Sequence, residues 1–65
     1  MPFIQVTLLE GRTTDEKHAL IRRLTEVTAE VLGGDAQRVR VALYEVSADD
    51  WGIGGVPVSV LRPIG

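Results

Sequence analysis

The sequence contains no cysteine, so neither a disulfide framework nor a thiolate metal site can hold this chain together. It also lacks long hydrophobic runs, because charged residues or glycines interrupt every apolar stretch well before the ~20 residues that a bilayer-spanning helix needs. It has no basic block, and 7 Lys and Arg against 9 Asp and Glu give a net charge of -2. Neither a membrane nor nucleic acid is therefore expected as a partner.

The length of 65 residues predicts a single domain, residues 1–65, with a small core. A chain of about 60 residues buries only about 60% of its unfolded surface. The composition is 45% hydrophobic with one Phe, one Trp and one Tyr, so the chain carries more aliphatic side chains than its own interior can hide. We therefore expect subunit interfaces. The amino terminus lacks the features of a secretory signal, which predicts a cytoplasmic location.

Two segments alternate apolar and polar residues in the manner of strands. Residues 3–9 place Ile4, Val6 and Leu8 on one apolar face, and residues 39–46 resume the alternation. The segment between them is long enough for a helical crossover, so the two strands are predicted to be parallel. The fold class is thus α+β, built on a βαβ unit. Two parallel strands do not make a stable sheet, so further strands are expected from neighbouring copies.

A helix is predicted from about Thr14 to Leu32. Thr13-Thr14-Asp15-Glu16 has the form of a capping box, and Gly33-Gly34 supplies a carboxy-terminal cap. Apolar residues spaced three or four apart form one stripe on this helix. They are Leu20, Ile21, Leu24, Val27, Val31 and Leu32.

The segment from Ser47 to the carboxy terminus is rich in turn residues. Its apolar stretch, residues 56–61, is interrupted by Pro57. We interpret the segment as a small hairpin or arm that reaches onto another subunit. Its glycines resemble a phosphate-binding loop, but neither Lys nor a predicted helix follows them, so they are interpreted as a turn.

The candidate base is Pro2. The only histidine, His18, has no helix neighbour that could orient or charge it, and is interpreted as solvent-facing. Methionine is generally removed before a small residue such as proline, which leaves a secondary amine at the amino terminus. An α-amine has an ordinary pKa of about 7.7–8.0, and both desolvation and a nearby arginine lower that pKa towards a neutral base. The alternative is that proline merely begins a strand.

Two arginines belong near the sheet rather than on the helix. Arg12 follows the first strand and Arg40 lies in the second. A guanidinium binds a carboxylate with two parallel hydrogen bonds and stabilises a developing enolate. The alternative for each is an ion pair with Glu10 or Glu45. The other arginines, Arg22, Arg23 and Arg38, are interpreted as surface charges, with Arg22 and Glu26 paired along the helix.

These residues resemble the 4-oxalocrotonate tautomerase family of small enzymes with an amino-terminal proline. The similarity runs from Pro2 to about Gly55 and rests on four segments: Pro2, Leu9-Glu10-Gly11-Arg12, Val39-Arg40-Val41 and Trp51-Gly52-Ile53-Gly54-Gly55. It implies a homohexamer, a trimer of dimers, in which two subunits pool their strands into a four-stranded sheet. The resemblance also implies that the segment from Ser47 to the carboxy terminus of each subunit holds the dimers together.

The resemblance also implies roles for the residues. Pro2 is the general base for ketonisation of a dienol acid such as 2-hydroxymuconate, Arg12 binds the distal carboxylate, and Arg40 of a neighbouring subunit holds the 2-oxo and carboxylate end. Leu9 and Trp51 line the pocket. Arg38 stands where better-known members have a small hydroxyl residue, which implies a more cationic pocket. Proton transfer of this kind needs neither a metal nor an organic cofactor.

Other functions stay open at this point. The alternative reactions for the same proline are hydrolytic dehalogenation, hydration of unsaturated acids, and a tailoring step in a biosynthetic pathway. Hydration needs a carboxylate to activate water, and Asp49 and Asp50 are the candidates near Trp51. The alternative from a different functional class is a non-catalytic oligomeric module that has kept the fold.

Overall fold

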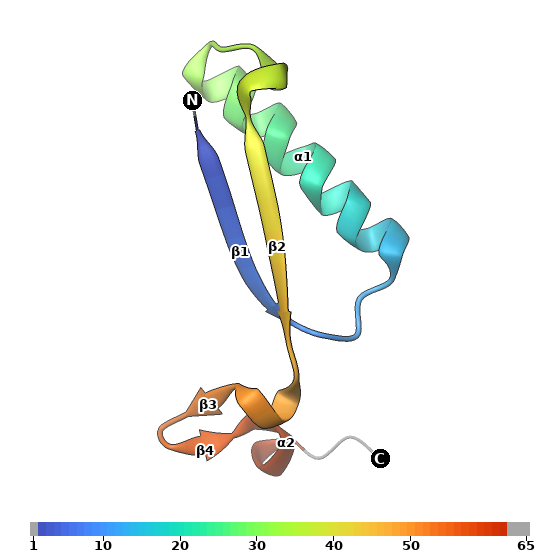
Figure 1. Ribbon diagram of the computed structural model, residues 1–65, viewed down its shortest axis with the longest axis vertical. Helices are drawn as coiled ribbons and strands as arrows, with labels where there is room; N and C mark the ends of the chain where they lie inside the picture. Colours follow the sequence, from blue (N-terminus) through green and yellow to red (C-terminus); the bar gives the residue numbers. More distant parts are fainter. Residues whose placement is uncertain (1, 63–65) are drawn as a thin grey trace.

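The computed structural model describes residues 2–62 and begins with a βαβ unit (Figure 1). Strand β1 (Phe3–Leu9) is followed by helix α1 (Thr14–Leu32), and strand β2 (Arg40–Val46) runs parallel to β1. Both the parallel strands and the helix bounds confirm the sequence prediction. Strand β2 begins at Arg40 rather than Val39, because the Val39 N–H donates to the Ala36 carbonyl and closes a 3₁₀ turn at Ala36–Arg38.

The helix begins and ends with the predicted caps. The Thr13 hydroxyl accepts a hydrogen bond from the Glu16 N–H at 3.1 Å, and the Glu16 carboxylate accepts one from the Thr13 N–H at 2.9 Å. At the other end, Gly33 adopts a left-handed conformation with φ of 68°, and its N–H donates to the Ala29 carbonyl. Glycine takes this conformation without the steric cost that a Cβ would add.

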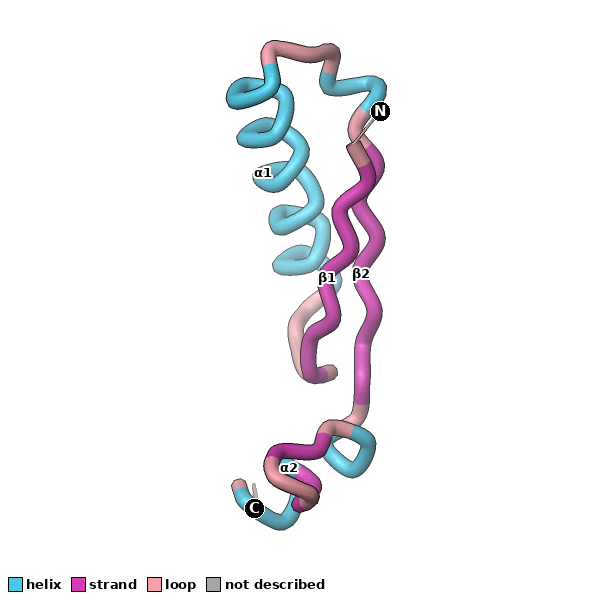
Figure 2. The backbone as a smooth tube through the Cα atoms, turned by 90° about the vertical axis from the view of Figure 1, so that its left-hand side faces the viewer, coloured by secondary structure: helices cyan, strands magenta, loops and turns pink. Residues whose placement is uncertain are grey.

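Helix α1 covers one face of the two-stranded sheet and leaves the other face open (Figure 2). The side chains of Ile4, Val6, Val41 and Leu43 lie half-buried on the covered face. Along α1, only the first half of the predicted stripe is covered in this way. Val27, Val31 and Leu32 are 50%, 75% and 65% exposed, because the helix turns Thr25, Thr28 and Ala29 towards the sheet in its second half.

The tail, residues 47–62, extends beyond the end of β2 (Figure 1). It contains a 3₁₀ turn at Ala48–Asp50, an antiparallel hairpin of β3 (Gly52–Ile53) and β4 (Val56–Pro57), and helix α2 (Val58–Leu61). The hairpin confirms the sequence prediction, whereas α2 was missed. Pro57 stands at the amino-terminal cap of α2, where its lack of an N–H costs nothing.

The chain has little interior of its own. Among the described residues, Val58 of the tail is the one buried hydrophobic side chain, at 5% exposed, and the Cα trace measures 43 × 25 × 14 Å. Large apolar side chains outside α1 are also exposed, among them Phe3 at 60% and Val60 at 66%. This confirms the inference from composition that the aliphatic content exceeds what one copy can hide.

The capping box predicts a measurable loss of stability when its hydroxyl is removed. Thr13→Ala leaves the Glu16 N–H without its acceptor, and we expect the free energy of unfolding to fall by about 1 kcal/mol. Urea denaturation followed by circular dichroism, at a fixed protein concentration, measures the change. Thr14→Ala, one residue further along and outside the box, is the matched control. Equal stability of the two variants would contradict the assigned cap.

Candidate active site

The candidate residues gather at two opposite ends of the sheet. Pro2 lies at the end where both strands begin, because the Arg40 N–H donates to the Pro2 carbonyl at 3.0 Å and Phe3 is the register partner of Arg40. Arg38, in the 3₁₀ turn before β2, lies at this same end. We call Pro2, Arg38 and Arg40 the proline end.

The charges of the two arginines at the proline end are not paired with a carboxylate among residues 2–62. The Arg40 guanidinium donates from Nη1 to the Gln37 carbonyl at 2.8 Å, which orients it without neutralising it. Within residues 2–62, neither Arg38 nor Arg40 has an ion-pair partner, whereas Arg12, Lys17, Arg22 and Arg23 each have one. For Arg40, the ion pair with Glu10 or Glu45 is therefore wrong. An unneutralised guanidinium is suited to bind an anion.

At the opposite end of the sheet, β1 ends at Leu9 and the chain turns towards α1. The Glu10 N–H donates to the Val46 carbonyl at 2.9 Å, which keeps the strands paired to their ends, and Gly11 takes a positive φ of 123° in the turn. Arg12 follows directly, with its side chain 65% exposed. We call Leu9, Arg12 and Trp51 the arginine–tryptophan end.

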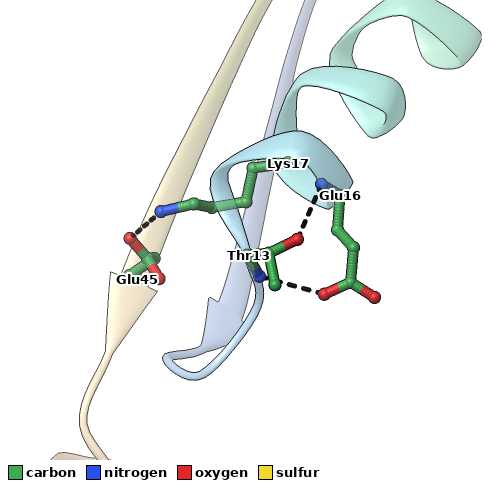
Figure 3. Close-up of polar contacts among 4 residues, drawn as sticks. All are labelled: Thr13, Glu16, Lys17 and Glu45. Atoms are coloured by element: carbon green, nitrogen blue, oxygen red, sulfur yellow. Dashed lines mark hydrogen bonds and ion pairs between the residues drawn. The ribbon is translucent and has the colours of Figure 1, made fainter.

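Arg12 is paired with Glu16 rather than with Glu10 or Glu45 as the sequence suggested. Its Nη1 lies 3.9 Å from Oε2 of Glu16. Oε1 of the same carboxylate accepts the Thr13 N–H (Figure 3). This hydrogen bond from the Thr13 backbone, and then the Thr13 hydroxyl and the Arg12 charge, lower the pKa of Glu16 below its usual value. Glu16 was missed as a partner of Arg12, although the i, i+4 spacing was a signal for it.

An ion pair fixes the start of α1 against β2. Nζ of Lys17 lies 2.7 Å from Oε1 of Glu45, and the two side chains are 25% and 35% exposed (Figure 3). Partial burial reduces the screening of such a pair by solvent. The contact joins the helix turn that carries Glu16 to the last residues of β2, and so steadies the end of the sheet at which Arg12 lies.

Trp51 is held where the tail begins. It follows the 3₁₀ turn Ala48–Asp50, is half-buried, and its carbonyl accepts the Val58 N–H at 2.8 Å. The two aspartates before it bind serine hydroxyls: Asp49 accepts from Ser59 at 2.6 Å and Asp50 from Ser47 at 3.1 Å. Both carboxylates therefore tie the tail together, next to the tryptophan.

One copy of the chain does not bring the two ends together. A seven-residue strand rises about 3.3 Å per residue, so the ends of β1 lie roughly 20 Å apart. Alternation along the strands also places the ring of Pro2 and the side chain of Arg40 on opposite faces of the sheet. A site that uses both ends must therefore combine residues of different copies.

Two features of the described residues bear on other kinds of function. Residues 2–62 hold no cluster of three or more His, Asp or Glu side chains suited to a metal ion. His18 is exposed on the surface of α1. No helix in this part of the chain has both the length and the apolar character to cross a membrane.

Comparison with known proteins gives a consistent result. Residues 2–61 match the family model described as tautomerase enzyme. A probable tautomerase of Ralstonia nicotianae is 50% identical over 62 residues, which are 95% of this chain and 89% of that protein. A 2-hydroxymuconate tautomerase of Pseudomonas sp. (strain CF600) is 42% identical over 62 residues, covering 95% and 98% of the two chains.

A solved structure agrees with these relatives. A heterohexamer 4-oxalocrotonate tautomerase from Chloroflexus aurantiacus superposes with a TM-score of 0.89 and 34% identity, over 95% of this chain and all (100%) of that one. The likeness extends over the βαβ unit and the tail alike, and so includes both the proline end and the arginine–tryptophan end. With a family model and relatives that span nearly the whole chain, this protein belongs to the tautomerase family and is an isomerase.

Proposed function

We propose that the chain is a cofactor-independent keto–enol tautomerase that ketonises 2-hydroxydienoates similar to 2-hydroxymuconate, with the nitrogen of Pro2 as general base. The observation that carries this proposal is the proline end, where Arg38 and Arg40, which have no carboxylate partner within residues 2–62, lie at the same end of the sheet as the candidate base. The family membership and the 2-hydroxymuconate tautomerase among the relatives support the choice of reaction.

In the proposed reaction, the Pro2 amine removes the proton of the 2-hydroxyl group and returns a proton to carbon 5. The C2=C3 double bond is replaced by the C2=O carbonyl, the C4=C5 double bond moves to C3=C4, carbon 5 becomes a methylene group, and the base is regenerated. Negative charge develops on the oxygen during the transfer, and the guanidinium groups of Arg38 and of Arg40 from a neighbouring copy stabilise it together with the adjacent carboxylate. Those cations also favour the neutral, basic form of the amine, because like charges repel.

The remaining candidates serve the far end of the substrate. Arg12 binds a distal carboxylate, and Leu9 and Trp51 form an apolar wall that excludes water. Leu9 and Trp51 are half-buried, whereas the side chain of Arg12 is exposed and accessible to a ligand. The Val58 N–H donates a hydrogen bond to the Trp51 carbonyl, and this bond holds the backbone of Trp51 in place for this role.

We further propose that the working enzyme is an oligomer, a homohexamer formed as a trimer of dimers. The exposed apolar residues and the open face of the sheet need partners, and the two ends of the site need different copies. The heterohexameric relative supports an assembly of six subunits. A hydratase is disfavoured, because the carboxylates of Asp49 and Asp50 already accept hydrogen bonds from serine hydroxyls.

The role of Pro2 predicts that activity depends on its free amine. A preparation that retains Met1 has an amide nitrogen at Pro2, which is not basic, and we expect no ketonisation of 2-hydroxymuconate above background. Pro2→Ala and Arg40→Ala, with Met1 removed, are expected to lower kcat/KM by about 10²-fold or more. The ultraviolet rate is measured on protein whose intact mass defines its first residue.

The matched control for these variants is Arg22→Ala, which removes a helix arginine that is paired with Glu26. We expect it to keep the wild-type rate and the wild-type assembly. A normal rate with Met1 retained would refute the role of Pro2. Loss of activity only where the oligomer also dissociates would point instead to a structural role for the residue changed.

The separation of the two ends predicts that inactive variants rescue one another. Pro2→Ala and Arg12→Ala subunits, unfolded and refolded together in equal amounts, should regain activity in about a quarter of the sites if Pro2 and Arg12 come from different copies. Each variant refolded alone is the control. Mixed oligomers, verified by native mass spectrometry, that stay as inactive as the separate variants would show that one copy supplies both residues.

A further inference from the structure

We propose that Glu16 is a specificity-determining residue, which sets how strongly the active site prefers a dicarboxylate over a monocarboxylate through its contact with Arg12. This inference rests on the proposed function, in which Arg12 binds the distal carboxylate of a 2-hydroxydienoate. It assigns Glu16 no contact with the substrate. Its effect is exerted through the charge that it places beside Arg12.

The position of the Glu16 carboxylate is fixed by two different partners. Oε1 accepts the Thr13 N–H at 2.9 Å, as one half of the capping box, and Oε2 lies 3.9 Å from Nη1 of Arg12. The carboxylate cannot swing away from Arg12 without giving up the hydrogen bond that caps α1. Its charge is therefore held at the start of α1, directly after the turn that carries Arg12.

The charge is also permanent at neutral pH. Hydrogen bonding to Thr13 and the nearby Arg12 lower the pKa of Glu16, so the side chain is ionised throughout the range in which an amine base would work. Nothing comparable stands at the proline end, where within residues 2–62 Arg38 and Arg40 have no ion-pair partner. The site thus has one strongly cationic end and one end that is partly neutralised.

This asymmetry has a consequence for substrates. A substrate carboxylate held by the Arg12 guanidinium comes within roughly 6–7 Å of the Glu16 carboxylate, and at that separation two like charges in water repel by enough to weaken binding about threefold. A substrate without a distal carboxylate does not meet this repulsion. Glu16 therefore lowers the advantage that Arg12 gives to dicarboxylates.

Glu16→Gln tests the inference, because glutamine keeps the acceptor for the Thr13 N–H and removes only the charge. The two substrates are 2-hydroxymuconate, with two carboxylates, and 2-hydroxypenta-2,4-dienoate, with one. We expect kcat/KM for the dicarboxylate to rise about threefold, mainly through KM, and that for the monocarboxylate to stay unchanged. The gain should shrink in 1 M salt, where the Debye length falls to about 3 Å.

Glu26→Gln is the matched control. It makes the same chemical change on the same helix, at a glutamate that pairs with Arg22 and Arg23, and it should leave the ratio of the two substrates as in wild type. If Glu16→Gln leaves the ratio unchanged, or lowers both rates equally, Glu16 has only a structural role and the inference is wrong. If wild type converts neither acid, the proposed function fails, and the inference fails with it.

Discussion

Parallel pairing of β1 with β2 is the constraint on which the rest of this structure depends. A parallel pair requires a crossover that returns the chain to the end where it began, and α1 makes that return along one face of the sheet. The amino terminus therefore lies beside the start of β2, which brings Pro2 and Arg40 together. The same pairing sends Leu9 and the turn to Arg12 to the other end.

The same constraint leaves the chain without a sufficient interior. One helix covers one face of two strands, so within residues 2–62 of a single copy the opposite face, both strand edges and the apolar residues in the second half of α1 lack partners. Association with further copies would cover these surfaces, and it would also bring a proline end of one copy to the arginine–tryptophan end of another. In the proposed enzyme, stability and catalysis then depend on the same contacts, because a dissociated subunit has neither a covered core nor both ends of the proposed site.

Much of this fold was predictable from local patterns. The bounds of β1 and α1 follow from alternation and from capping residues, whose effects reach only a few positions along the chain. Helix α2 was missed because a four-residue helix beside Pro57 has no periodicity to detect. The exposure of Val31 was not predictable either, because spacing shows which residues share a helix face but not how far the sheet extends beneath them.

The candidate residues could be named from the sequence, but their electrostatic state could not. Helix arginines acquire partners through spacing, as Arg22 does with Glu26, whereas Arg40, the first residue of β2, has no carboxylate partner among residues 2–62. Arg12 stands between these cases: it lies outside α1, yet the capping box places Glu16 close enough to pair with it. A motif that begins a helix thereby places a carboxylate that partly offsets the charge of an arginine proposed to bind substrate. In the proposed site, local stability and substrate preference are coupled at this one side chain.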